Sequence, residues 1–313
     1  MTKHRIMLFG ATGTAGAGAL VGLRDAGHEV VCFGRSAPEG GAEFVRGDVT
    51  DPRQLRAAFA GRGITAVVSC LASRSGAPRD AWAVDHGAQL AVLAAGQAAG
   101  VGHLVLLSAI CVQRPKLAFQ QAKLAFEAAL IASGLRYSIV RPTAFFKSLS
   151  GQVARVRAGR PFMVFGDGRL TACKPISDRD LGRYIAGCLD DPARWDAVLP
   201  IGGPGPAITP LDQVAMLSDL LGRAVPVRRV PVALLDTIAG GLGALGKLYA
   251  PAAEKAQLAR IGRYYATESM LVWDGARYDA QATPTFGSDT LRNHYAALLA
   301  GQATVDLGAH GVF

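Results

Sequence analysis

The feature that most constrains this chain is a glycine-rich stretch close to its start, Gly10-Ala-Thr-Gly13-Thr-Ala-Gly16. It follows an apolar run at residues 6–9, which predicts a buried strand, and it precedes a helical pattern of apolar residues at 19–26. In that context Gly10 would allow a tight exit from the strand, Gly13 the approach of a pyrophosphate, and Gly16 close packing of the helix. The N–H groups at the start of the helix would bind phosphate oxygens, and the candidates there are Thr12, Thr14 and Ala15. Dinucleotide binding is the favoured interpretation, and a turn with a purely structural role is the alternative.

Short apolar runs alternate with helical patterns through the first half of the chain. The runs lie at residues 5–9, 29–33, 66–69, 104–107 and 137–140, with a further short strand near 44–45. Helical patterns lie between them at residues 15–26, 52–59, 80–99 and 117–133. This alternation predicts an α/β fold with a doubly wound parallel sheet of the Rossmann type, covered by helices on both faces.

The regular alternation of short apolar runs and helical patterns ends after residue 142. Residues 162–165 and 170–173 flank Gly166-Asp-Gly168 and predict a hairpin, and helical patterns begin at 177, 209 and 289. We therefore predict a Rossmann domain at residues 1–142 and a smaller α+β substrate lobe at residues 143–300, which is free to return elements to the first domain. Residues 301–313 are rich in glycine and alanine and are expected to fray.

The composition restricts the class of protein. The chain has 313 residues, half of them hydrophobic, which is enough for a large domain with a smaller lobe. Its net charge of +9 fits nucleic acid, an anionic membrane surface or anionic small ligands, but no Lys/Arg run interleaved with aromatics supports nucleic acid. The five cysteines form no CxxC pair, which favours a reducing compartment and predicts neither disulfides nor a metal site.

The sequence also predicts a location. No signal-peptide pattern precedes the glycine motif, and no segment reaches the roughly 18 uninterrupted apolar residues of a membrane span. Residues 230–248 come nearest, and they fit either a core helix or an interfacial one. We expect a cytoplasmic protein, and peripheral association with a membrane remains an open alternative.

Residues that follow the predicted strands are the next cofactor candidates. The spacing of the glycine motif resembles that of the extended and atypical short-chain dehydrogenase/reductase families. After the second strand, Arg35 stands where NAD-selective sites carry an acid, so that Arg35 and Ser36 would hold the 2′-phosphate of NADP. In the short-chain reductase pattern, Asp48 reaches the adenine amino group and Val49 packs on the ring. The same pattern places the chain after the fourth strand beside the cofactor, at Leu71, Ala72 and Ser73.

A serine and a lysine follow at the predicted carboxyl edge of the sheet. Ser108 ends the fifth strand, where open α/β sheets bind ligands. These families carry Tyr-x-x-x-Lys on the next helix, and this chain has Phe119 at the tyrosine position and retains Lys123. A carbonyl reductase would lose its acid by this change, whereas reduction of a conjugated C=C bond does not require a phenol. We expect Lys123 to hold the nicotinamide ribose and to act in catalysis from the mouth of the site.

Four long strings resemble one family. They are Leu-Ser-Ala-Ile-Cys-Val-Gln at 107–113, Phe-Gln-x-Ala-Lys-Leu-x-Phe-Glu at 119–127, Arg-Pro-Thr-Ala-Phe-Phe-Lys-Ser-Leu-Ser-Gly-Gln at 141–152 and Phe-Gly-Asp-Gly-x-Leu-Thr-Ala-Cys-Lys-Pro-Ile-Ser at 165–177. They are similar to the NADPH-dependent divinyl chlorophyllide 8-vinyl-reductases of photosynthetic organisms, over roughly residues 5 to 300. The resemblance implies reduction of a ring vinyl group to ethyl in chlorophyll or bacteriochlorophyll biosynthesis, and a phenylalanine native at position 119. We add Pro142 and Thr143, in the third string, to the cofactor-binding candidates.

The implied substrate, a divinyl chlorophyllide, is a flat apolar tetrapyrrole with a propionate. Such a substrate needs an aromatic slot and a cation. The aromatic candidates are Phe145, Phe146, Phe162 and Phe165, for which ordinary core packing is the alternative. The candidate cations are Lys147 and Lys174.

Two other functions remain open at this stage. One is a non-enzymatic NADP-binding regulator or assembly factor, which the phenylalanine at position 119 weakly favours. The other is an epimerase or a reductase of a different conjugated alkene.

Overall fold

The chain folds into two compact units in a computed structural model that describes residues 3–245 and 250–304. Unit 1 comprises the residues up to Pro142 together with Asp178–Ile201, and unit 2 comprises Thr143–Ser177 and the residues from Gly202 onward. The chain thus leaves unit 1 after Pro142, returns to it at Asp178 and leaves again after Ile201. The run of residues 143–300 is therefore interrupted by a segment that belongs with the first unit.

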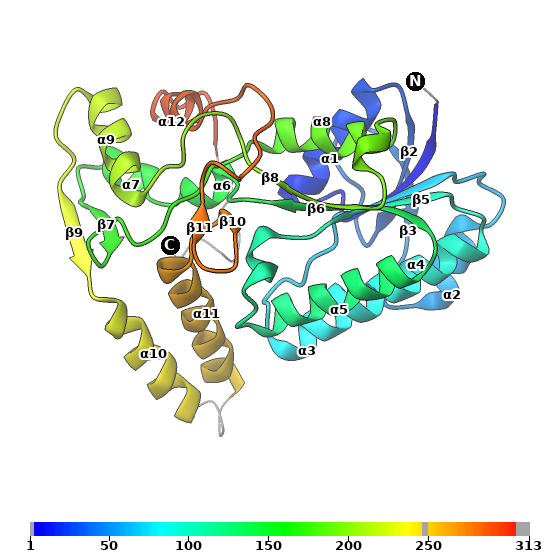
Figure 1. The fold of residues 1–313 in the computed structure, drawn as a ribbon, viewed down its shortest axis with the longest axis horizontal. Helices are drawn as coiled ribbons and strands as arrows, with labels where there is room; N and C mark the ends of the chain where they lie inside the picture. Colours follow the sequence, from blue (N-terminus) through cyan, green and yellow to red (C-terminus); the bar gives the residue numbers. More distant parts are fainter. Residues whose placement is uncertain (1–2, 246–249, 305–313) are drawn as a thin grey trace. The chain divides into compact units, whose positions relative to one another are not determined.

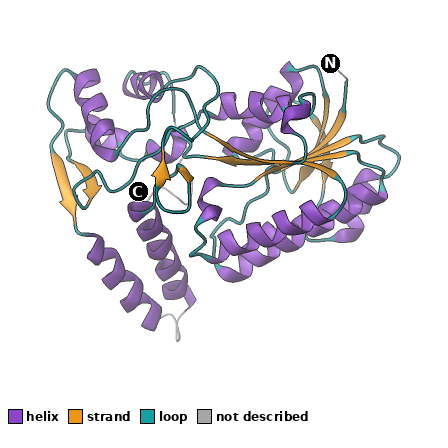
Figure 2. Cartoon of the chain, viewed as in Figure 1, coloured by secondary structure: helices purple, strands orange, loops and turns teal. Residues whose placement is uncertain are grey.

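Unit 1 is built on a seven-stranded sheet in the order β3-β2-β1-β4-β5-β6-β8. Figure 2 draws its strands in orange. Its strands are β1 (Arg5–Phe9), β2 (Glu29–Gly34), β3 (Glu43–Arg46), β4 (Ala66–Ser69), β5 (His103–Leu107), β6 (Arg136–Pro142) and β8 (Ala197–Ile201). Every neighbouring pair is parallel. The predicted doubly wound parallel sheet is confirmed. The seventh strand was not predicted: it lies at the sheet edge, is mostly half-buried and contains a proline.

Helices cover both faces of this sheet (Figure 1). Helices α1 (Thr14–Asp25) and α8 (Asp178–Gly187) lie on one face. On the other lie α2 (Pro52–Phe59), α3 (Pro78–Ala81), a π-helical segment (Trp82–Ala88), α4 (Gln89–Ala98) and α5 (Ala118–Ala132). Short 3₁₀ turns occupy Ile110–Gln113 and Pro192–Arg194. The single helix expected at residues 80–99 thus has a π-helical first half, which the apolar periodicity did not reveal.

Helices α1 and α8 approach each other closely because glycines line their contact. A Cβ added to Gly18 would lie 2.2 Å from the carbonyl oxygen of Asp178. A Cβ added to Gly182 would lie 1.9 Å from the carbonyl oxygen of Gly18. Since real Cβ atoms do not approach backbone so closely, any larger residue at these positions would separate the two helices. The helix that begins at the glycine motif is therefore packed against a helix more than 150 residues later in the sequence.

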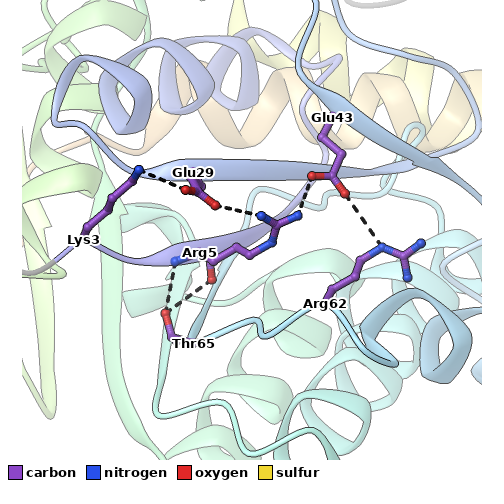
Figure 3. Close-up of polar contacts among 6 residues, drawn as sticks. All are labelled: Lys3, Arg5, Glu29, Glu43, Arg62 and Thr65. Atoms are coloured by element: carbon purple, nitrogen blue, oxygen red, sulfur yellow. Dashed lines mark hydrogen bonds and ion pairs between the residues drawn. The ribbon is translucent and has the colours of Figure 1, made fainter.

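An ion-pair network ties together the amino ends of three neighbouring strands (Figure 3). Arg5 on β1 donates to Glu29 on β2 at 2.7 Å and to Glu43 on β3 at 2.6 Å. Thr65 Oγ1 accepts from the backbone N–H of Arg5 at 3.2 Å. Because these side chains are partly exposed to water, each pair contributes at most about 1 kcal/mol. The network marks the edge of the sheet opposite to its carboxyl ends.

Unit 2 has its own apolar core. Its elements are α6 (Phe146–Leu149), α7 (Val153–Arg157), β7 (Phe162–Phe165), α9 (Pro210–Leu221), β9 (Val227–Val230), α10 (Val232–Leu245), α11 (Ala250–Thr267), β10 (Val272–Trp273), β11 (Tyr278–Asp279) and α12 (Leu291–Leu299). The core gathers side chains from α6, α7, β7, α9 and α12, with Tyr295 fully buried among them. Helix α9 begins as the sequence predicts, at an N-cap Thr209 whose side chain forms a capping box with Asp212.

The hairpin predicted at residues 162–173 is wrong. Gly166 and Gly168 do form a turn with positive φ values of 61° and 80°. However, the strand before the turn, β7, pairs in parallel with β9, and Cys173 after the turn forms isolated bridges with Ile208 and Met270. The partners of β7 and Cys173 are distant in sequence, so the local turn signal could not identify them.

Helix α10 lies wholly within the apolar stretch at residues 230–248, and residues 246–249 lie outside the described part of the chain. Helix α10 packs along α11 (Figure 1). Among the residues that the structure describes, we find no helix with the length and apolar character needed to span a bilayer. The predicted tail at 301–313 falls mostly on residues 305–313, which are likewise outside the described residues.

Candidate active site

The glycine turn joins β1 to α1 at the carboxyl edge of the sheet. Gly10 has a φ of 78°, and a Cβ there would lie 2.6 Å from the carbonyl oxygen of Cys70. A Cβ on Gly16 would lie 2.0 Å from the carbonyl oxygen of Gly10. Gly10 thus makes the tight strand exit and Gly16 the close helix packing that the sequence predicts.

The middle of the same turn is open. Gly13 is exposed, and the nearest atom to an added Cβ would be the carbonyl oxygen of Gly10 at 3.5 Å. Gly13 is also the N-cap of α1 and provides no side-chain cap, so the first N–H groups of the helix face an uncovered surface. Thr12 is exposed, and Thr14 and Ala15 are half-buried. This turn fits the pyrophosphate of a dinucleotide, because backbone donors and the helix dipole meet at Gly13, which carries no side chain.

The next candidates lie at the carboxyl ends of β2 and β3. Arg35 and Ser36 are exposed, immediately after β2. Asp48 lies after β3, and its carboxylate accepts hydrogen bonds from the backbone and the hydroxyl of Thr50 at 2.9 and 2.7 Å. These two bonds hold the pKa of Asp48 below its usual value, and the charge of Arg35 adds a smaller effect. Val49 is half-buried against the core of unit 1.

Lys123 is buried, and this differs from the expected position at the mouth of the site. Its side chain is 10% exposed, and its ammonium lies 2.9 Å from a carboxylate oxygen of Asp85, whose side chain is fully buried. Asp85 belongs to the π-helical segment that precedes α4. Its carboxylate also accepts the backbone N–H of Ser73, at 3.3 Å, in the loop after β4. Phe119, one turn before Lys123 on α5, is half-buried.

Ser108 belongs to a second buried network. Its hydroxyl donates to Glu127, which lies one helical turn after Lys123 on α5. Glu127 in turn forms a two-point contact with the Arg141 guanidinium on β6. Such a fork-shaped pair fixes the carboxylate in one orientation, and the carboxylate in turn fixes the Ser108 hydroxyl.

The two networks meet at one narrow gap in unit 1. Its lining residues are Asp85, Gln89, Leu106, Leu107, Ser108, Lys123 and Phe126. Gln89 accepts the hydroxyl proton of Ser69 at 2.8 Å, which joins the end of β4 to the same group. The structure therefore brings Ser108 and Lys123 together, as the sequence analysis expected, at the carboxyl edge of the central strands.

The remaining predicted site residues divide between the units. Leu71 packs against the core of unit 1, and Ala72 beside it is exposed. Pro142 ends β6 in unit 1, whereas Thr143 begins unit 2 and its hydroxyl donates to the carbonyl of Lys174.

The substrate candidates all lie in unit 2. Phe146 and Phe162 are buried in its core, so packing accounts for both of them. Phe145 and Phe165 are only half-buried. Lys147 is half-buried in α6, and the Lys174 ammonium donates to the carbonyl oxygen of Thr283 at 3.0 Å.

Comparison with known proteins identifies the family. A family model described as NAD(P)H-binding matches residues 10–192. The whole chain is 45% identical, over 335 aligned residues, to the chloroplastic divinyl chlorophyllide a 8-vinyl-reductase of Oryza sativa subsp. indica, and covers 83% of that protein. The chain belongs to the divinyl chlorophyllide a 8-vinyl-reductase family. A photosystem II assembly factor, Ycf39 of Trieres chinensis, is much less similar, with 25% identity over 74% of each chain.

The fold of this 8-vinyl-reductase family member also occurs in solved structures. An NADPH-dependent quinone oxidoreductase from Escherichia coli, in complex with NADPH, superposes with a TM-score of 0.68. The match covers 94% of this chain and 99% of the other, at 18% sequence identity. At that identity the similarity concerns the fold alone.

Sequence reasoning missed the buried carboxylates of Asp85 and Glu127. Both carried a signal that could have been used. Asp85 and Gln89 form a polar pair one turn apart in a mostly apolar helical pattern, and Glu127 follows Lys123 at the spacing that places two side chains on one helix face. A charged residue in an apolar helical stripe is rarely buried unless a partner compensates it.

Proposed function

We propose that this protein reduces the 8-vinyl group of a divinyl chlorophyllide to an ethyl group, with NADPH as the electron donor. The observation that carries the proposal is the 45% identity to the rice reductase along the whole chain. The geometry of the site supports it, because Lys123 and Ser108 line a common gap and the position one turn before Lys123 holds Phe119. A site without a phenolic acid suits a C=C bond better than a carbonyl.

The choice of NADPH over NADH rests on Arg35. Its guanidinium is exposed at the end of β2, where an NAD-selective site places a carboxylate for the ribose 2′-hydroxyl. Arg35 and Ser36 would bind the 2′-phosphate, and the open turn around Gly13 would bind the pyrophosphate. Asp48 and Val49 would border the adenine.

The reduction adds a hydride to one vinyl carbon and a proton to the other. Bound NADPH would supply the hydride. The ammonium of Lys123 would hold the nicotinamide ribose and stabilise negative charge that develops on the conjugated substrate. Phe119 carries no exchangeable proton, so the proton must come from Lys123, from another polar group of the site or from water.

We assign binding of the macrocycle to unit 2, which would act as the substrate lobe. The side chains of Phe145 and Phe165 would contact the flat apolar face of the macrocycle, because packing in the core does not bury them fully. Lys147 and Lys174 would compensate the propionate. The alternative for Phe146 and Phe162 is a purely structural role, which their burial supports.

We also propose that the protein acts in the cytoplasm or at the surface of a photosynthetic membrane. The outer side of α10 exposes Leu234 and Ile238, one turn apart, at 48% and 40%. The exposed Arg228 and Arg229 immediately precede this helix on β9. Apolar side chains beside cations suit a bilayer with anionic lipids. Sedimentation with anionic and with neutral vesicles, compared between the native protein and Leu234→Asp, tests this location.

The decisive experiment is incubation of the purified protein with NADPH and divinyl chlorophyllide, followed by the absorption shift of the macrocycle. Conversion of vinyl to ethyl with oxidation of NADPH supports the reductase. Binding of NADPH without conversion of any conjugated alkene would favour a regulator or assembly factor, as the distant relative Ycf39, a photosystem II assembly factor, is named. Conversion of another alkene alone would assign a different reductase.

A further inference from the structure

We propose that Asp85 is a positioning residue that holds both the ammonium of Lys123 and the cofactor-facing loop after β4. The proposal rests on the proposed function for its reaction, and it adds a residue that the sequence analysis did not identify. The carboxylate of Asp85 lies between the two elements that it joins: helix α5 through Lys123 and the loop through the backbone of Ser73.

Burial makes the contact with Lys123 obligatory. The Asp85 side chain is fully buried and the Lys123 side chain is 10% exposed, so water compensates neither charge well. A buried charge without a partner is strongly unfavourable, whereas an ion pair at 2.9 Å with a further hydrogen bond is tolerated. Asp85 thus fixes where the ammonium lies within the gap that Lys123 shares with Ser108.

The second contact reaches the cofactor loop. The N–H of Ser73 lies 3.3 and 3.4 Å from the two oxygens of Asp85. Ser73 follows Leu71 and Ala72 in the segment that we expect to lie beside the cofactor. Movement of Asp85 would therefore disturb the loop and the lysine together.

The backbone around Asp85 supports a dedicated role. Residues Trp82–Ala88 form a π-helix between two α-helical segments, and Asp85 is at its centre. Helices widen in this way at a cost in hydrogen-bond geometry, and such segments occur frequently at functional sites. The wider i→i+5 turn changes the direction in which the side chains of this segment point, and this segment packs against α5.

A double-mutant cycle tests the proposal. We would compare Asp85→Asn, Lys123→Met and the double variant with the native protein, by NADPH affinity in fluorescence titration and by kcat for vinyl reduction. If Asp85 acts through Lys123, Asp85→Asn lowers kcat by about tenfold in the native background and by less than about twofold when Lys123 is absent. Equal losses in the two backgrounds would overturn the proposal.

Two readouts do not depend on vinyl reduction. Amide hydrogen exchange of the loop at Ser73, measured without cofactor, should accelerate in Asp85→Ala, and NADPH affinity should fall. Because neither needs chlorophyllide, they test Asp85 even if the substrate assignment fails. Unchanged exchange and unchanged NADPH affinity would reject the positioning role.

Matched variants separate charge from packing, and they keep the test valid if Lys123→Met does not fold. Asp85→Glu retains the charge and Asp85→Asn retains the shape, so positioning by charge predicts that the glutamate variant binds NADPH more tightly. Tighter NADPH binding by Asp85→Asn than by Asp85→Glu would indicate a packing role and contradict the proposal. Asp180→Asn is the control, because Asp180 is also fully buried and paired with an arginine, but on α8. It should leave NADPH affinity unchanged.

Discussion

Removing the charge of Lys123 should destabilise the protein as well as inactivate it. The sequence alone suggested that Lys123→Ala would leave the fold intact, because a lysine at the mouth of a site contributes little to the core. The structure places this side chain at 10% exposure against a fully buried Asp85 carboxylate. Loss of one partner from a buried pair costs about 3–5 kcal/mol, because the other charge remains uncompensated. For Lys123→Met, which preserves the apolar stem, we expect a loss in this range.

The assay is chemical and thermal unfolding of the protein without cofactor. A cost of this size corresponds to a fall in melting temperature on the order of 10 °C. The double variant Asp85→Asn/Lys123→Met carries no uncompensated charge, so it should recover much of the lost stability. A Lys123→Met protein within about 1 kcal/mol of the native one, with no gain from the second change, would refute the reasoning.

Four further predictions address the cofactor, the phenyl group and pH. Arg35→Asp should lose a charge-assisted contact of about 1.5–3 kcal/mol and sharply reduce the ratio of kcat/KM for NADPH to kcat/KM for NADH. Equal use of both cofactors by the native protein would exclude a role for Arg35 in selecting NADPH. Phe119→Tyr should give no large gain in vinyl reduction, whereas a large gain would identify a degraded carbonyl-reductase site. Gly16→Ala should unfold or distort the turn, because its Cβ would lie 2.0 Å from a backbone oxygen. Gly13→Ala, whose Cβ would lie 3.5 Å from the nearest atom, should fold normally and weaken NADPH binding alone. Circular dichroism and fluorescence titration distinguish the two effects, and equal behaviour of the two variants would contradict the geometry. Burial, with a smaller effect of Arg136, lowers the pKa of His103 to about 4. Below pH 6.5 the unfolded chain therefore binds a proton that the folded chain does not, and the free energy of unfolding should fall by about 3 kcal/mol between pH 6.5 and 4. Urea unfolding of His103→Gln should show a smaller loss over this range, and a pH dependence identical to that of the native protein would contradict the prediction.

The sequence predicts the parts of this fold that depend on local patterns. The apolar runs at 5–9 and 66–69 coincide with β1 and β4, because buried parallel strands are continuously hydrophobic and end at turn residues. The roles of Gly10 and Gly16 are also predictable from the motif, because they depend on nearby backbone. A Cβ on Gly16 would clash with Gly10 in the same turn, and a Cβ on Gly10 would clash with Cys70 at the end of the adjacent strand.

The parts that were missed depend on partners distant in sequence. The partner of β7 is β9, more than 60 residues later, and a turn between glycines carries no information about it. Asp85 and Lys123 are 38 residues apart, and only the packing of the π-helical segment against α5 makes them neighbours. In the site, residue types and strand ends identify Ser108 and Lys123, but burial and pairing require the assembled sheet.

The close packing of α1 against α8 has a consequence for biosynthesis. The cofactor helix is made within the first 25 residues, but the glycine face of α8 against which it packs is translated only at Asp178–Gly187, after a whole segment of unit 2. An amino-terminal fragment that ends at Pro142 would leave Gly18 and Gly22 uncovered and would lack the edge strand β8. During translation, unit 1 therefore cannot close until about residue 201 has left the ribosome. The two units cannot be separated by a single cut, and a gene that encodes the cofactor-binding unit alone must omit residues 143–177 and retain Asp178–Ile201.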